Sequence, residues 1–218
     1  MLLAFDEVVT GFRVSPGGAQ GRFGITPDLT ALAKVLAGGL PGGALVGRAD
    51  VLEPLDFEAT TARGLEKIQH PGTFNANPLS AAAGIAALEQ IEATDPCARA
   101  NAIAEKLRQG FNEVLEAEDV AWAAYGTFSG IHIFTNPARR RLRPGDFDHF
   151  AVPYRELKTR QGNITHRLRL AMLLHGVELT SWPGALVSAA HSEADVADTI
   201  EAFAESVRLL KREGDIGA

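Results

Sequence analysis

The stretch LLAFDEVVTGFR, residues 2–13, decides the fold, because an apolar run ends there in two adjacent carboxylates, Asp6 and Glu7. Apolar residues that follow one another without alternation are typical of a strand buried on both faces, as in a parallel sheet. Residues 1–6 are therefore predicted to form a short buried strand. Ligands of open α/β sheets collect at the carboxyl ends of strands, so an acid at this place indicates a candidate site. A turn or cap residue is the alternative for Asp6 taken alone.

A lysine stands within the apolar stretch ALAKVLA, residues 31–37. Burial disfavours an ammonium group, so Lys34 either reaches solvent along its apolar stem or lies in the interior as a desolvated amine. A desolvated lysine can react with a carbonyl group. The spacing between Asp6 and Lys34 suits two neighbouring parallel strands joined by one crossover.

The third notable stretch is HPGTFNANP, residues 70–78, in which Gly72 and Thr73 precede a predicted helix. A backbone N–H and a hydroxyl in such a loop can bind a phosphate, although a loop threonine can equally bond to its own neighbours. A lysine amine, a carboxylate for a pyridinium nitrogen and donors for a phosphate are what pyridoxal phosphate requires of a protein.

Four stretches together carry a resemblance to a known family: LLAFDEVVTGFR, TPDLTALAKVLAGGLPGGALVGRADV, HPGTFNANPLSAAAGIAALE and VSAAHSEADV. They resemble the class-III (fold-type I) pyridoxal-phosphate-dependent aminotransferases, most of all the glutamate-1-semialdehyde 2,1-aminomutases. The resemblance implies an α/β fold made of the C-terminal part of a large parallel-sheet domain and a smaller C-terminal α+β domain. We expect residues 1–118, with a linking helix over 96–117, to form the first part and residues 119–218 the second.

The resemblance also implies site residues and a cofactor, pyridoxal 5′-phosphate. Asp6 would pair with the pyridine nitrogen, and Val8 would pack against a face of the ring. Lys34 would form the internal aldimine and then move the proton at the substrate α-carbon. Thr73 would bind the phosphate, usually across the interface of a homodimer, and Glu7 would be a structural carboxylate beside the site.

Three functions stay open. The first is transamination of small amino and keto substrates through the lysine aldimine. The second is the intramolecular amino shift of the aminomutases, although segment 182–186, WPGAL, lacks the acid that these enzymes carry there. The third is a non-catalytic fragment or remnant, because family members are longer and Met1 opens directly on the predicted strand.

Composition excludes several other classes of protein. The formal net charge of −6 argues against nucleic acid as a partner, and no apolar stretch of 18 residues indicates a membrane span. The single cysteine, Cys97, excludes an intrachain disulfide, and with no signal peptide the sequence predicts a cytoplasmic protein. The six histidines show no metal-ligand spacing, so no metal is expected.

The remaining pattern predicts further elements. A helix from Pro78, capped by Asn77, has small and apolar residues nearly all round and should be buried on several sides. Paired strands are expected around Gly126 and Gly130, and a helix should end at Gly176. We expect short strands over 178–181 and 185–190, and Ser192 with Asp195 predicts a capping box for the last helix.

Overall fold

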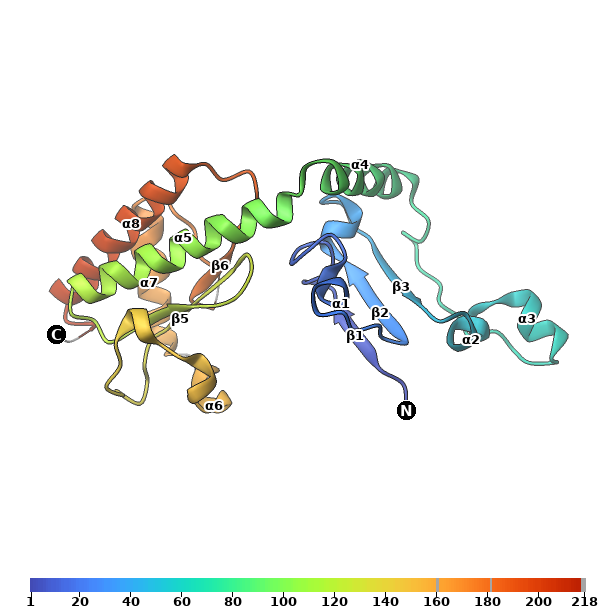
Figure 1. Ribbon diagram of the computed structural model, residues 1–218, viewed down its shortest axis with the longest axis horizontal. Coiled ribbons are helices and arrows are strands. Elements are labelled where there is room, and N and C mark those ends of the chain that lie inside the picture. The colour runs from blue at the N-terminus through green and yellow to red at the C-terminus, as the bar shows by residue number, and fades with distance from the viewer. Residues whose placement is uncertain (160, 181, 217–218) are drawn as a thin grey trace. The chain divides into compact units, whose positions relative to one another are not determined.

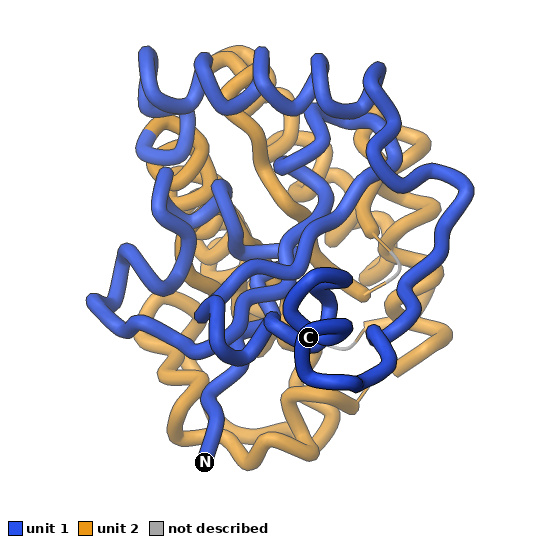
Figure 2. Tube along the Cα trace, turned by 90° about the vertical axis from the view of Figure 1, so that its right-hand side faces the viewer, with its two compact units in different colours: residues 1–98 blue, residues 99–218 orange. Residues whose placement is uncertain are grey.

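The computed structural model describes residues 1–159, 161–180 and 182–216, and the chain divides into two compact units. The first unit comprises residues 1–98 and the second residues 99–218, as Figure 2 shows in two colours. The sequence-based boundary at residue 118 stays a prediction. Each unit is described by itself below.

The first unit is built on a three-stranded sheet in the order β1-β2-β3 (Figure 1). Strands β1 (Ala4–Glu7) and β2 (Leu29–Ala33) are parallel, and β3 (Gly43–Gly47) runs antiparallel to β2. Helix α1 (Gly18–Phe23) lies in the connection between the two parallel strands. The predicted pair of parallel neighbours is therefore present, with its acid-bearing strand at one edge of the sheet.

The prediction that residues 1–6 form a buried strand is wrong for this chain. Leu2 and Leu3 are 58% and 45% exposed, and within β1 only Glu7 is buried. The physical reason is the position of β1, which has a single neighbouring strand in the described sheet. An apolar run thus marks the strand without showing what covers it.

The rest of the first unit is helical. The 3-10 helix η1 (Lys34–Ala37) follows β2 directly, and after β3 come α2 (Ala49–Leu52), η2 (Glu53–Leu55), α3 (Phe57–Ala62) and α4 (Pro78–Thr94). Figure 1 shows α3 lying away from the three strands. The side chain of Asn77 accepts from the backbone N–H groups of Leu79 and Ser80, which confirms the predicted cap of α4.

Helix α4 contacts η1 through glycines that let the two backbones approach closely. A Cβ added to Gly84 would lie 2.5 Å from the carbonyl oxygen of Leu36, and one added to Gly38 would lie 2.3 Å from that of Ala83. Only Gly84 and Ile91 of α4 are buried, so the expected burial on several sides is wrong for this chain. One face of the helix packs on η1, and most residues on its other faces are exposed or half-buried.

The second unit is an α+β structure around a three-stranded antiparallel sheet in the order β4-β5-β6. The strands are β4 (Ala123–Tyr125), β5 (Gly130–Phe134) and β6 (Gly184–Leu186). The helices are α5 (Pro96–Ala117), η3 (Pro144–Asp146), η4 (His149–Ala151), α6 (Tyr154–Leu157), α7 (Gly162–Leu174) and α8 (Glu193–Arg212). The paired strands expected around Gly126 and Gly130 are confirmed as β4 and β5.

The core of the second unit gathers one face of α5, α7, α8 and the inner side of the sheet. Residues spaced by four on α5, namely Ile103, Leu107, Phe111 and Leu115, are at most 5% exposed. The ring of Phe111 stacks on that of Phe203 from α8 at 4.2 Å between centroids. Burying each such side chain contributes about 1.5–3 kcal/mol. The amphipathic period read from the sequence therefore marks the face that holds this unit together.

The ends of the helices in this unit follow their sequence signals in most places. Ser192 and Asp195 form the expected capping box of α8, and Gly176 has the left-handed φ of +83° two residues after α7.

The strand expected over 178–181 is absent at residues 178–180, and residue 181 lies outside the described residues. Strand β6 begins at Gly184 and ends at Leu186, so it covers only the start of the predicted 185–190.

Candidate active site

Asp6 and Lys34 lie at the same end of adjacent parallel strands. The register pairs Asp6 with Ala31, three residues before Lys34, and β2 ends at Ala33. With strands about 4.8 Å apart and a rise of about 3.3 Å per residue, the two Cα atoms are separated by on the order of 10 Å. Both side chains are exposed. A planar ring of pyridine size fits between an amine and a carboxylate that start from such positions.

The backbone of Lys34 has an unusual conformation. Its φ of +51° lies in the left-handed region, which costs a non-glycine residue on the order of 1–2 kcal/mol. Its Nζ has no hydrogen bond or ion pair within the part of the chain that the structure describes. Of the two alternatives for this side chain, the exposed one is observed here, which corrects an interior placement. Strain of this kind clusters at functional sites.

Asp6 and Glu7 point to opposite faces of β1, because successive side chains alternate along a strand. Asp6 is exposed, and its Oδ1 accepts a hydrogen bond from the backbone N–H of Val8 at 3.1 Å. Glu7 is 1% exposed. The two adjacent acids therefore have different environments, one open to a ligand and one enclosed by protein.

The Glu7 carboxylate is surrounded by hydrogen-bond donors. Its oxygens accept from the backbone N–H groups of Ala19 at 2.8 Å and Gln20 at 2.9 Å, and from the Thr10 hydroxyl at 2.8 Å. Burial raises the pKa of Glu7, but these hydrogen bonds outweigh it and hold the pKa below its usual range. Glu7 thus joins the end of β1 to the start of α1, which makes it a structural carboxylate.

Val8 follows Asp6 in the turn after β1 and is half-buried. Thr73 lies in the turn Thr73–Ala76 before α4 and is exposed. In the described residues no hydrogen bond or ion pair joins Thr73 to Asp6 or Lys34, so this chain does not by itself bring all three together. The roles of these four residues toward a cofactor remain proposals.

A cavity of about 420 Å³ in the first unit is lined by residues that follow Lys34 and Thr73 in the sequence, but not by these two residues themselves. Its lining includes Leu36 and Ala37, which follow Lys34, the loop 41–43 and the turn 74–77, which follows Thr73. The chain segments that carry the lysine and the threonine therefore share one hollow in the same unit.

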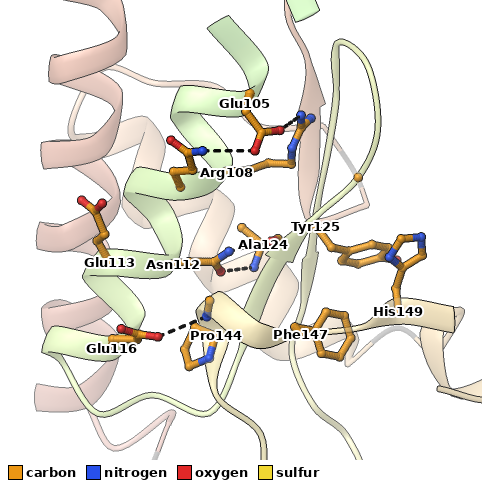
Figure 3. A pocket seen from close by; sticks show the side chains of 13 residues that line it. Glu105, Arg108, Asn112, Glu113, Glu116, Ala124, Tyr125, Pro144, Phe147 and His149 are labelled. Carbon is orange, nitrogen blue, oxygen red and sulfur yellow. Dashed lines mark hydrogen bonds and ion pairs between the residues drawn. The ribbon is translucent and has the colours of Figure 1, made fainter. Parts of the chain in front are cut away.

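The second unit has a groove of about 410 Å³ beside α5, shown in Figure 3. The guanidinium of Arg108, which is 7% exposed, donates to the carbonyl oxygens of Phe128 at 2.9 Å and Gly130 at 2.6 Å, and it pairs with Glu105. These contacts satisfy the buried charge within the protein and indicate a packing role for this groove.

Two segments near the end of the chain concern the choice of reaction. Segment 182–186 carries no acid, and its last three residues form β6. The Nδ1 atom of His191 accepts from the backbone N–H of Ser188 at 3.3 Å, directly before the cap of α8. This contact lies in the turn that precedes the capping box of α8.

The class-III aminotransferase family matches residues 1–152 of the chain. The chain belongs to this family. The family consists of enzymes that use pyridoxal 5′-phosphate for transamination or for amino shifts, which confirms the expected cofactor and the general class of chemistry.

Several known proteins are similar to the chain. A glutamate-1-semialdehyde 2,1-aminomutase of Pyrobaculum aerophilum is 38% identical over 97% of this chain and 46% of its own length. The crystal structure of an omega-transaminase from Sphaerobacter thermophilus has a TM-score of 0.78 at 30% identity, over 95% of this chain and 44% of its own. A transaminase with pyridoxal phosphate bound has a TM-score of 0.79 at 25% identity, over 98% and 45%.

These likenesses confirm the fold-type I class predicted from the sequence. The chain spans about half the length of the curated relative it matches. No helix in the described ranges is long and apolar enough to span a membrane. In the same residues no group of three or more His, Cys, Asp or Glu side chains could hold a metal ion.

The donors present fit pyridoxal phosphate. Lys34 offers an amine without a partner in the described residues, and Asp6 offers a carboxylate whose only hydrogen bond there is the one from Val8. Sequence reasoning missed the residues that place these two, above all Thr10, Gly38 and Gly84. The sequence shows Gly38 and Gly39 as a pair after Lys34, but it does not show that Gly38 contacts the distant helix α4.

Proposed function

We propose that this chain supplies the amine and the ring carboxylate of a pyridoxal-phosphate site that transfers amino groups between small amino and keto compounds. The observation that carries the proposal is the placement of Lys34 and Asp6 at the carboxyl ends of neighbouring parallel strands. Family membership supports it independently.

Lys34 has two tasks in this proposal. Its Nζ is the amine that would hold the cofactor covalently, in exchange with the substrate amine. The freed amine then moves a proton at the substrate α-carbon. Lys34 has a left-handed backbone directly after β2, and its side chain is exposed.

Asp6 holds a proton on the ring nitrogen. Its carboxylate is exposed and accepts from the Val8 N–H through Oδ1, which leaves Oδ2 able to accept a hydrogen bond from a ring N–H. When bound, the protonated cofactor ring withdraws electrons from the substrate carbon. Val8 supplies an apolar contact for the ring next to that acid.

Thr73 completes the proposal as a phosphate ligand provided to the neighbouring subunit of a homodimer. Its hydroxyl is exposed and has no hydrogen-bond partner in the described part of the chain. This fits a group that acts on a ligand outside its own subunit, and it explains why no bond joins Thr73 to Asp6 or Lys34.

A second candidate function is the intramolecular amino shift. The similarity to a glutamate-1-semialdehyde 2,1-aminomutase favours it, whereas the absence of an acid in segment 182–186 favours ordinary transamination. Product analysis distinguishes the two, because transamination requires a separate keto acceptor and the shift does not.

The test is to incubate the purified chain with pyridoxal phosphate, reduce it with borohydride and locate the label by peptide mass spectrometry. We expect a visible yellow absorption before reduction and one labelled residue, Lys34. The variant Lys34→Ala should lose both, whereas Lys67→Ala, a lysine of the same unit outside the site, should keep both. A well-folded chain that stays colourless and unlabelled would indicate a non-catalytic remnant instead.

A further inference from the structure

The buried carboxylate of Glu7 accepts hydrogen bonds from both helix α1 and the turn after β1. Three donors converge on its two oxygens, and their distances of 2.8–2.9 Å are those of charge-assisted hydrogen bonds. Helix α1, whose Ala19 and Gln20 N–H groups donate two of these bonds, has only six residues. The network also includes the turn directly after Asp6, so its consequences extend to the candidate site.

That turn connects Glu7 to Asp6 in three steps. The Glu7 side chain accepts from the Thr10 hydroxyl, and the Glu7 carbonyl oxygen accepts from the backbone N–H of Gly11 at 2.9 Å. These two bonds fix residues 8–11 as a tight turn. Within this turn, the Val8 N–H donates a hydrogen bond to Asp6 Oδ1 at 3.1 Å.

Two glycines approach Glu7 closely, Gly18 at its side chain and Gly11 at its backbone. A Cβ added to Gly18, which has a φ of +64°, would lie 2.5 Å from Glu7 Oε2, and one added to Gly11 would lie 2.8 Å from the Glu7 carbonyl oxygen. Neither glycine position therefore has room for a larger side chain beside Glu7.

We propose that Glu7 is a positioning residue that orients the Asp6 carboxylate toward the cofactor ring, through the turn of residues 8–11 and the Val8 N–H. The inference deepens the proposed function and rests on it. Glu7 does not touch the cofactor, because the strand sends its side chain to the face opposite Asp6.

The test is a double-mutant cycle on pyridoxal-phosphate affinity, measured by absorbance titration of the full chain. The variants are Asp6→Asn, Glu7→Gln and the double variant. Glu7→Gln keeps the shape of the side chain but turns an N–H₂ group toward the donors, and we expect it to weaken affinity roughly tenfold. In the Asp6→Asn background the same change should have little further effect, because both act on one interaction.

A matched control separates positioning from general stability. In the same unit Asp56 accepts from the backbone N–H of Ala59 at 2.8 Å at the start of α3, so its carboxylate also caps a short helix. Asp56→Ala should lower stability and leave the affinity for pyridoxal phosphate unchanged. Additive effects of Asp6→Asn and Glu7→Gln, or an equal loss of affinity in Asp56→Ala, would overturn the inference.

A second readout needs no cofactor. Amide hydrogen exchange of the Val8 N–H should become roughly tenfold faster in Glu7→Gln than in the parent chain, relative to amides of α4. Unchanged exchange at Val8 would overturn the inference alone. Unchanged pyridoxal-phosphate binding in both Lys34→Ala and Asp6→Asn would instead refute the proposed function.

Discussion

The side-chain amide of Asn112 pairs with both backbone polar groups of Ala124. Its Nδ2 donates to the Ala124 carbonyl oxygen at 2.9 Å, and the Ala124 N–H donates to its Oδ1 at 2.7 Å (Figure 3). Ala124 lies in β4, an edge strand of the second sheet. A side chain from α5 therefore occupies the place of a missing neighbouring strand and closes that edge.

The substitution Asn112→Ala should destabilise the chain by about 2 kcal/mol, because it leaves the N–H and C=O of Ala124 unpaired. Urea unfolding measures the loss. Gln109→Ala, which removes one exposed hydrogen bond to Glu105 on the same helix, should change stability by less than about 0.5 kcal/mol. Equal losses in the two variants would show that the pairing with Ala124 contributes nothing particular.

Two substitutions of Lys34 should distinguish the effect of its strained backbone from the effect of losing its amine. Lys34→Gly relieves the left-handed backbone and should be more stable than Lys34→Ala by about 1 kcal/mol. Both variants lose the amine, so both should fail to retain pyridoxal phosphate after borohydride reduction. Thermal unfolding of the two proteins measures the difference, and equal stabilities would argue against strain at this position.

The contact between α4 and η1 should make Gly84 intolerant of a methyl group. Gly84→Ala gains helix propensity of about 1 kcal/mol, but its Cβ would lie 2.5 Å from the Leu36 carbonyl oxygen, so we expect net destabilisation. Because η1 begins at Lys34, the variant should also bind pyridoxal phosphate more weakly.

The same substitution in open space is the control. A Cβ added to Gly21 in α1 would meet only the Ser15 hydroxyl at 3.8 Å, an ordinary contact. Gly21→Ala should therefore be neutral or stabilising by up to about 1 kcal/mol. If Gly84→Ala is as stable as Gly21→Ala in urea, the close approach of the two backbones has no energetic weight.

Glu7 should make stability depend on acid pH. Its pKa is held below the usual range in the folded chain, so its contribution is complete above the unfolded value and is lost as pH falls through the folded one. The free energy of unfolding should thus decline below about pH 4.5 more steeply in the parent chain than in Glu7→Gln. Parallel pH profiles would contradict this expectation.

Much of the second unit could be predicted from its sequence because its signals are local. The bounds of α5 follow from a spacing of four between apolar residues, and the capping box of α8 follows from Ser192 and Asp195. The segment 178–180 does not form the predicted strand, because a short stretch with one apolar residue, Leu179, does not show whether a neighbouring strand is available for pairing.

The first unit shows what a single sequence leaves out. Asp6 and Lys34 could be assigned to neighbouring strand ends from their spacing and from family resemblance. The exposure of Leu2, Leu3 and α4 could not, since burial depends on what covers a surface and not on its own composition. The hydrogen bonds of Glu7 to Ala19 and Gln20 were equally hidden, because helix α1 has only a weak signal.

The alternation of Asp6 and Glu7 along β1 has a consequence for how the chain finds its native pairing. A slip of β1 by one position against β2 would exchange the faces of the two acids and leave the amides at the start of α1 without their carboxylate. The mispaired state would lose three charge-assisted bonds at once. The hydrogen bonds of the enclosed acid therefore favour the register in which Asp6 remains on the exposed face of the strand.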